Sequence, residues 1–146
     1  MVDLLLDLAN ANVTSVFAQP IQANAGDDVL LTLTFADGSL GTIVYASGGD
    51  RSLPKEYLEV LGGGRAAVLD DFRAVRLHSG GSSKAVGGRL ARQDKGHAAE
   101  LAAFVQAVQN GGRSPLDPWM AAHVTRVTFA ATESVQTGLP VQIAPT

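Results

Sequence analysis

Residues 29–45, VLLTLTFADGSLGTIVY, decide the fold class of this chain. Leucine, valine and phenylalanine alternate with threonine up to Phe35, and a second alternating run begins at Leu40. Such alternation is typical of strands with one buried face, and the dipeptide Asp37-Gly38 between the runs favours a two-residue type I′ turn. The stretch therefore predicts an antiparallel β-hairpin.

A two-residue turn at Asp37-Gly38 also predicts the register of the hairpin. One face then carries three opposed and mostly apolar pairs, Phe35–Leu40, Leu33–Thr42 and Leu31–Val44. The other face carries a mixed set, with Leu30, Thr32, Ile43 and Tyr45 as its larger members. This second face is too apolar to meet only water, so we expect it to contact another subunit.

Further strands and a loop are expected on both sides of the hairpin. Leu4, Leu5 and Leu8 have helical spacing, and Val13–Phe17 is strand-like. Three short strands are predicted at residues 56–61, 65–69 and 72–77. The glycine- and serine-rich residues 79–94 show no periodicity, which favours a mobile loop.

Two helices and a last strand complete the pattern. The first helix is predicted over 97–109, because apolar residues recur there at helical spacing before an Asn-Gly-Gly stop. Asp117-Pro118 is an N-cap followed by proline at the first helical position, and that helix should run to about Gln136. Residues 141–143 form the last strand. The order predicts one α+β domain over 1–146, an open, mostly antiparallel β-sheet with helices packed on one face and the other face available for oligomerisation.

Composition excludes several classes of protein. The chain has 11 basic and 14 acidic residues and no basic stripe, which argues against nucleic-acid binding. It has no cysteine, so disulfides and thiolate zinc sites are excluded. Its apolar runs are too short to span a membrane, and the acidic N-terminus does not resemble a signal peptide. We therefore expect a cytoplasmic protein.

Two patterns in the sequence do not predict a binding site. Gly62-x-Gly64-x-x-Ala67 has the lettering of a dinucleotide-binding turn, but a strand rather than the required helix is expected after it. We therefore expect no cofactor to bind to this chain. The three histidines, His78, His97 and His123, lie too far apart in sequence to predict a metal site.

One polar cluster is a candidate for ligand binding. Arg92, Asp94, Lys95 and His97 lie where a loop enters a helix, and their side chains could hydrogen-bond to a hydroxyl-rich molecule. The alternative, a solvated charged helix start, remains open from the residues alone.

Six segments in order resemble one known family. They are residues 2–5 (VDLL), 13–16 (VTSV), 31–47 (LTLTFADGSLGTIVYAS), 56–72 (EYLEVLGGGRAAVLDDF), 93–111 (QDKGHAAELAAFVQAVQNG) and 131–143 (ATESVQTGLPVQI). Together they resemble the C-terminal domain of the glucose–fructose oxidoreductase / inositol dehydrogenase / rhizopine-catabolism (Gfo/Idh/MocA) family, over nearly the whole chain.

The resemblance implies that cofactor binding and substrate binding belong to different domains of the protein. In that family an N-terminal Rossmann domain binds NAD or NADP, while the C-terminal domain helps to bind a sugar or polyol and forms oligomer contacts. A catalytic-site histidine typically stands three residues before the aspartate that corresponds to Asp3, which would be one residue upstream of Met1. The Rossmann domain and that histidine would therefore be absent from residues 1–146. Asp3 carries over as part of the motif and not as a catalytic residue.

For the candidate cluster, the resemblance places Lys95, Gly96 and His97 at a helix start that often borders the substrate. The candidates for substrate binding are therefore Lys95 and His97, with Arg92 of the same cluster. We expect a substrate-binding and oligomerisation domain of an NAD(P)-dependent sugar or polyol oxidoreductase, inactive without its Rossmann domain and assembled as a homodimer or larger homo-oligomer. The alternative is a free-standing, non-catalytic binding or oligomerisation module. The reading frame upstream of Met1 would distinguish the two.

Overall fold

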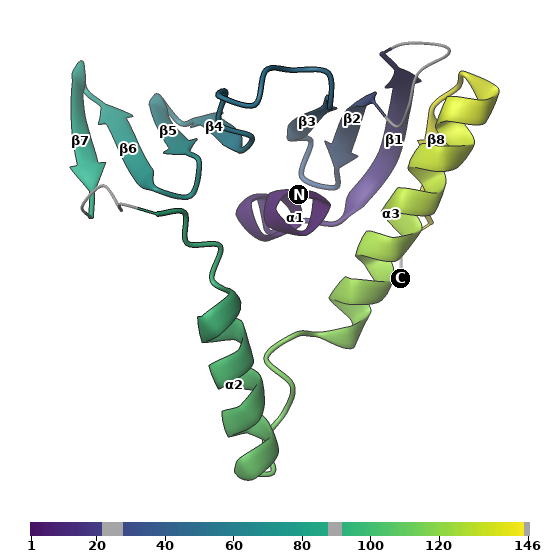
Figure 1. The fold of residues 1–146 in the computed structure, drawn as a ribbon. Helices are drawn as coiled ribbons and strands as arrows, with labels where there is room; N and C mark the ends of the chain where they lie inside the picture. Colours follow the sequence, from purple (N-terminus) through teal and green to yellow (C-terminus); the bar gives the residue numbers. More distant parts are fainter. Residues whose placement is uncertain (22–27, 88–91, 145–146) are drawn as a thin grey trace. The chain divides into compact units, whose positions relative to one another are not determined.

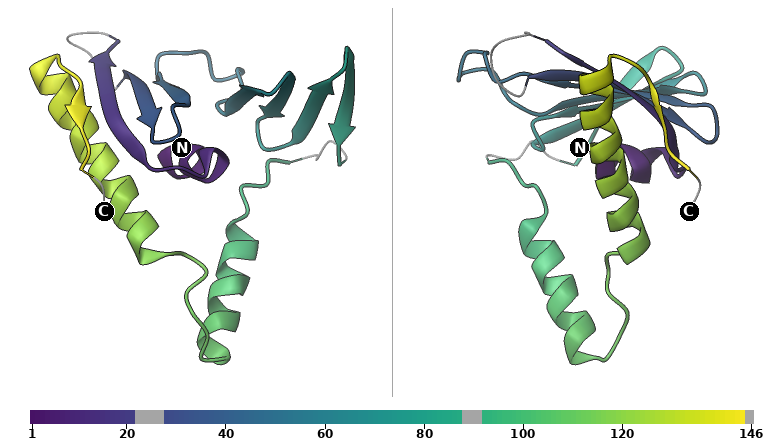
Figure 2. Two further views of the ribbon diagram at one scale, coloured as in Figure 1. Left: turned by 180° about the vertical axis from the view of Figure 1, so that it is seen from behind. Right: turned by 90° about the vertical axis from the view of Figure 1, so that its right-hand side faces the viewer.

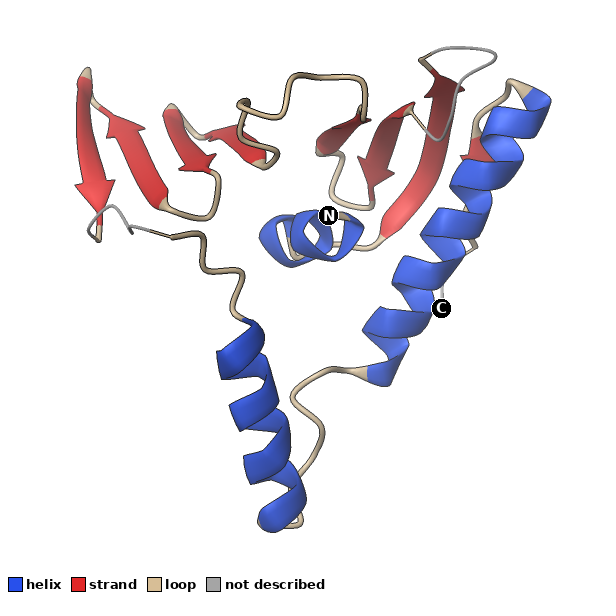
Figure 3. Ribbon diagram, viewed as in Figure 1, coloured by secondary structure: helices blue, strands red, loops and turns tan. Residues whose placement is uncertain are grey.

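The computed structural model describes residues 1–21, 28–87 and 92–144, which form two compact units. The first unit is Met1–Gly48 with Leu116–Thr146, and the second is Gly49–Pro115. Each unit contains an open antiparallel sheet, and three helices occur among the described residues (Figure 3). The α+β class is confirmed, although the strands form two sheets and not one. A single domain over 1–146 stays a prediction.

The first unit packs two helices on one face of its sheet. The sheet has the strand order β3 (Leu40–Tyr45), β2 (Val29–Phe35), β1 (Val13–Pro20), β8 (Val141–Gln142). α1 (Val2–Ala9) and α3 (Pro118–Thr137) contribute Leu6, Val127 and Ala130 to its core. The sheet contributes the inward-facing residues of β1 and β2 to the same core, and an irregularity in the pairing of β1 between Val13 and Ser15 interrupts their alternation: Val13, Val16, Ala18, Leu31, Leu33 and Phe35. Figure 1 and Figure 2 show α3 lying along β1.

Local signals fix the ends of α3 as expected. Asp117 Oδ1 accepts a hydrogen bond from Trp119 N at 3.0 Å, Pro118 is the first helical residue, and Gly138 ends the helix with φ of 69°. The buried residues of α3 are His123, Val127, Ala130 and Ser134. Two of these four are polar, and both bind the backbone of β1. Ser134 Oγ accepts from Ala18 N at 2.9 Å, and His123 Nε2 accepts from Val13 N at 3.1 Å.

The predicted hairpin is present, but its predicted register is wrong by one residue. Leu33 lies opposite Gly41 and Leu31 opposite Ile43. The turn has three residues and not two, because Phe35 N donates to Ser39 O and Gly38 takes φ of 86°. Asp37 Oδ1 also accepts from both the N–H and the hydroxyl of Ser39.

This shift exchanges the faces of β3. Ile43 packs against the core, so it cannot belong to the outer face on which the sequence placed it. Tyr45 lies opposite Val29, on the core side as well. The outer face instead carries Leu30 and Val44 as a pair, with Thr32 opposite Thr42.

The second unit contains a meander and one helix. Its sheet has the order β4 (Tyr57–Gly62), β5 (Arg65–Asp70), β6 (Ala74–Ser79), β7 (Ser82–Val86), and α2 (His97–Gln109) follows. The prediction of a loop over 79–94 is wrong for residues 82–86, which form β7. Gly80 and Gly81, with φ of 57° and 75°, make the two-residue turn that pairs Ser79 with Ser82. Residues 88–91 of the expected loop lie outside the described residues.

The expected strand 72–77 begins two residues later, at Ala74, because the turn before it is centred on Asp71 and Phe72. One face of the second sheet is largely aliphatic. The pairing places the charged residues Arg65 and Lys84 on it, together with six larger aliphatic side chains: Leu58, Val60, Leu69, Val75, Leu77 and Val86. None of the described residues of the second unit is buried. The apolar stripe of α2 is exposed as well, at Leu101, Phe104, Val105 and Val108.

The register predicts unequal effects on stability for two neighbouring substitutions. A Cβ atom added to Gly41 would lie 3.1 Å from both Leu5 Cδ1 and Phe35 Cε2, so Gly41→Val should lower the free energy of unfolding by about 1–3 kcal/mol. Thr42 is exposed on the outer face, so Thr42→Val should change it by less than about 0.5 kcal/mol. Urea denaturation of both variants measures the difference. The reverse order of effects would show that Thr42 faces the core.

His123 predicts a pH-dependent stability. Burial, and secondarily the Arg126 cation, lower its pKa from the ordinary value of 6.5. The unfolded chain therefore binds this proton more tightly, so stability is complete above about pH 6.5 and falls as the pH drops below it, by at most about 1.4 kcal/mol per pH unit. His123→Gln, which can still accept from Val13 N, should remove this part of the pH profile. His97→Gln, on an exposed residue, should leave it in place.

Candidate functional site

The loop that enters α2 is tied to the second sheet through its backbone. Asp94 N donates to Phe72 O at 3.2 Å, and Asp94 Oδ1 accepts from Gly96 N at 2.9 Å. Gly96 then starts the helix with φ of 81°, a conformation that glycine adopts without a steric penalty. These bonds fix the path of the chain on both sides of Lys95.

Side chains from three separate segments meet beside this loop. Lys95 Nζ forms an ion pair with Glu56 Oε1, and Gln93 Nε2 donates to Glu56 Oε2 at 2.7 Å. The same amide nitrogen donates to Asp71 Oδ1 at 2.8 Å. Gln93 therefore uses both of its N–H groups to join two carboxylates. We call these four residues the Lys95 network.

The network surrounds a strained turn. Asp71 and Phe72 have φ of 53° and 51°, which is the left-handed region, and neither is glycine. Arg73 N donates to Asp70 O at 2.9 Å across the turn, and Asp71 N donates to Glu56 O at 2.7 Å. Such residues cost on the order of 1–3 kcal/mol each and persist where neighbouring contacts hold them, often beside ligand sites.

The electrostatics of the network centre on Glu56. The hydrogen bond from Lys95 lowers the pKa of Glu56 most, and the amide of Gln93 adds to the effect, while desolvation opposes it. The side chains of Lys95 and Glu56 remain 37% and 20% exposed. The Lys95 side chain is therefore partly open to a ligand, and its ammonium group has more donors than Glu56 can use.

The structure separates the residues predicted from the sequence. Lys95 lies in the network, whereas Arg92 and His97 are exposed and take no part in it. Asp3 lies in the first unit, where its Oδ1 accepts from the Met1 ammonium at 2.7 Å, and this bond lowers the pKa of Asp3. Sequence reasoning missed Glu56, Asp71 and Gln93. The non-glycine turn that unites them has no marker in the sequence.

The rejected dinucleotide motif is a hairpin turn. Gly63 and Gly64 have φ of 54° and 72° and join β4 to β5, with Gly62 opposite Arg65. The N–H groups of a helix start are not available there, so these residues do not fit a nicotinamide cofactor. In the described ranges, no three His, Asp or Glu side chains lie close enough to hold a metal ion, and no helix is long and apolar enough to cross a membrane.

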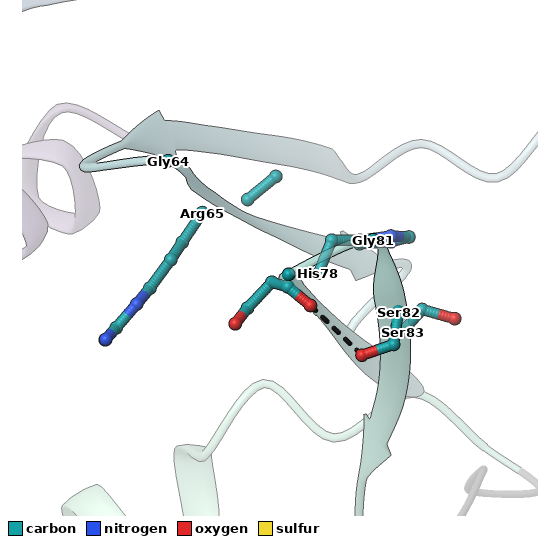
Figure 4. A pocket seen from close by; sticks show the side chains of 9 residues that line it. Gly64, Arg65, His78, Gly81, Ser82 and Ser83 are labelled. Atoms are coloured by element: carbon teal, nitrogen blue, oxygen red, sulfur yellow. Dashed lines mark hydrogen bonds between the residues drawn. The ribbon is translucent and has the colours of Figure 1, made fainter.

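A shallow pocket of about 460 Å³ lies at the turns of the second sheet, among Gly64, Arg65, His78, Gly81, Ser82 and Ser83. Ser82 Oγ donates to Ser79 O at 3.0 Å (Figure 4). The Arg65 side chain extends away from the serines in this view. The pocket therefore does not gather its polar groups around one point, and the Lys95 network is the better candidate site.

No protein-family model matches the sequence, and no curated protein matches it. Solved structures do match its fold. An aldose–aldose oxidoreductase from Caulobacter crescentus, complexed with glycerol, is 18% identical with a TM-score of 0.79, and the match covers 97% of this chain and 44% of that one. UDP-N-acetylglucosamine 3-dehydrogenase from Acidithiobacillus ferrooxidans is 22% identical with a TM-score of 0.77, covering 93% of this chain and 44% of that one.

A third match is an oxidoreductase from Agrobacterium radiobacter, in complex with NAD+, L-tartaric acid and magnesium. It is 14% identical with a TM-score of 0.76, and the match covers 97% of this chain and 46% of that one. This chain thus spans less than half the length of the three proteins. It has a fold that these oxidoreductases contain, which is the fold expected from its resemblance to the C-terminal domain of the Gfo/Idh/MocA family.

Proposed function

We propose that this chain is the substrate-binding and oligomerisation domain of an NAD(P)-dependent sugar or polyol oxidoreductase, and that it is inactive without a cofactor-binding domain. One observation carries the proposal. The match covers 97% of this chain but only 44% of an aldose–aldose oxidoreductase, at a TM-score of 0.79. Most of such an enzyme then lies outside the part that corresponds to this chain.

The substrate side of the proposal rests on the Lys95 network. An ammonium group with spare donors, two carboxylates and an amide are the groups that bind hydroxyls. Arg92 and His97 are exposed on either side of Lys95 in the sequence and add two further donors. We assign the substrate contact to Lys95, with Arg92 and His97 as additional contacts.

The cofactor must come from elsewhere in the enzyme. The glycine turn at 62–64 does not fit a dinucleotide, for the reasons given above. When bound by its own domain, the nicotinamide would supply hydride chemistry. This domain would hold the sugar or polyol, and no chemical step is assigned to its residues.

Ligand titrations test this assignment. The chain should give no heat with NAD or NADP at millimolar concentration, whereas D-glucose or myo-inositol should shift the backbone amide signals of residues 92–97 in NMR spectra. Lys95→Met should abolish the sugar-induced shifts, and Lys84→Met, on an exposed strand residue, should not. Micromolar affinity for either cofactor, or sugar shifts confined to the pocket at Arg65 and His78, would contradict the proposal.

The oligomerisation part of the proposal concerns the aliphatic face of the second sheet. Six larger aliphatic side chains lie on this face and none of them is buried, while Arg65 and Lys84 are the charged residues on it. Burying one such side chain is worth about 1.5–3 kcal/mol, so a second copy of the face is a suitable partner. The outer face of the first sheet is the weaker candidate, because Thr32, Thr34 and Thr42 divide its apolar residues.

Two matched substitutions distinguish these faces. Leu77→Glu places a carboxylate on the aliphatic face, where the opposing Lys84 can pair with it and help to keep the sheet folded. It should reduce the mass found by light scattering from that of a dimer to 15.1 kDa. Val44→Glu, on the outer face of the first sheet, should leave the dimer intact. A monomeric wild type at high micromolar concentration would refute both interfaces.

A further inference from the structure

We infer that Glu56 and Gln93 are positioning residues for Lys95, and that they set the direction of its ammonium group at the start of α2. This inference rests on the proposed function, in which Lys95 contacts the substrate. It assigns roles to two residues that would not themselves have to touch that substrate.

Lys95 differs from the other lysines of the chain. The sequence contains three, Lys55, Lys84 and Lys95. All three lie in the described part of the chain, and of these lysines only Lys95 forms an ion pair. Exposed lysines ordinarily keep much of their side-chain freedom, because ordering a long side chain for one surface ion pair gains little. Other interactions must therefore offset the conformational entropy that the Lys95 side chain loses in this ion pair.

The carboxylate of Glu56 is itself held in one orientation, which favours the ion pair with Lys95. Its two carboxylate oxygens have different donors, Lys95 Nζ at Oε1 and Gln93 Nε2 at Oε2. Rotation of the carboxylate would break the second bond, and Gln93 in turn is held by Asp71 Oδ1 at 2.8 Å. Glu56 is thus a fixed acceptor, and the lysine that pairs with it takes a fixed direction.

The backbone makes this arrangement rigid. Asp71 N donates to the carbonyl of Glu56, and the carbonyl of Phe72 accepts from Asp94 N. The strained turn and the loop that carries Gln93 and Lys95 are therefore joined by backbone and by side-chain bonds. In the described part of the chain, Arg92 and His97 form no side-chain bonds of this kind, so Lys95 is the candidate contact with a defined direction.

NMR of the lysine side chains tests the inference without a ligand. The order parameter of the Lys95 ammonium should be high in the wild type, while Lys55 and Lys84 should be mobile. Glu56→Gln keeps the shape but removes the charge, and should make Lys95 as mobile as the other two. Glu59→Gln, in the strand that begins directly after Glu56, is the matched control and should change nothing. Lys95→Met should also raise the pKa of Glu56 toward its ordinary value.

Titration with D-glucose and myo-inositol then tests the consequence. Glu56→Gln and Gln93→Leu should each weaken binding roughly tenfold, while the backbone amide spectrum stays that of the folded chain. If Glu56→Gln unfolds the protein, Gln93→Leu decides alone, because Glu56 keeps its charge in that variant.

The outcomes separate the two proposals. A mobile Lys95 in the wild type, or a Lys95 that stays ordered in both variants, overturns the positioning role. Sugar binding that is lost in Lys95→Met but kept in both other variants also overturns it, while supporting the proposed function. An ordered Lys95 that Glu56→Gln releases, in a wild type that binds neither sugar, supports the positioning role and removes the proposed substrate contact.

Discussion

The first unit depends on the way α3 satisfies the backbone of β1. β8 pairs with β1 only at Ser15 and Val16, so it is too short to satisfy the whole edge of that strand. A buried N–H group without a partner costs on the order of 1–3 kcal/mol, and α3 offers two buried acceptors, His123 and Ser134. These residues are 11 positions apart, which is three helical turns and about 17 Å. Val13 and Ala18 are five strand residues apart, which is also about 17 Å.

This agreement of lengths aligns the helix with the strand. The two acceptors lie on one helical face, with Val127 and Ala130 between them, so polar bonds enclose an apolar contact. Hydrophobic packing alone tolerates sliding of a helix along a sheet, whereas two hydrogen bonds at a fixed spacing do not. Within its described residues, the second unit has no comparable arrangement. Its helix and its sheet both leave apolar side chains exposed, and a partner that binds either surface would stabilise that unit by an amount that grows with the logarithm of its affinity.

Much of the fold could be predicted because the decisive signals are local. Asp117-Pro118 and Gly138 bound α3 as caps do in general. The hairpin at 29–45 was equally clear, but its register was not, since Ala36-Asp37-Gly38 serves a three-residue turn as well as Asp37-Gly38 serves a shorter one. The sequence analysis did not predict β7, because serine and lysine in residues 82–86 do not give the alternation of apolar residues typical of a strand. The Gly80-Gly81 turn before it is nevertheless a strong hairpin signal. Of the candidate site, only Lys95 could be found, because Glu56 and Asp71 come near it through strand pairing between distant residues.

The Lys95 network also explains how a strained turn can persist on an exposed part of the chain. Without a bridge, the carboxylates of Glu56 and Asp71 would repel each other, and the left-handed conformations of Asp71 and Phe72 would relax. Gln93 joins the two carboxylates, and Lys95 offsets part of their charge. The turn and the lysine are consequently coupled. An anionic or hydroxyl-rich molecule that drew Lys95 away from Glu56 would weaken the contacts that hold the turn. Ligand binding at the start of α2 would therefore change the stability of the turn between β5 and β6.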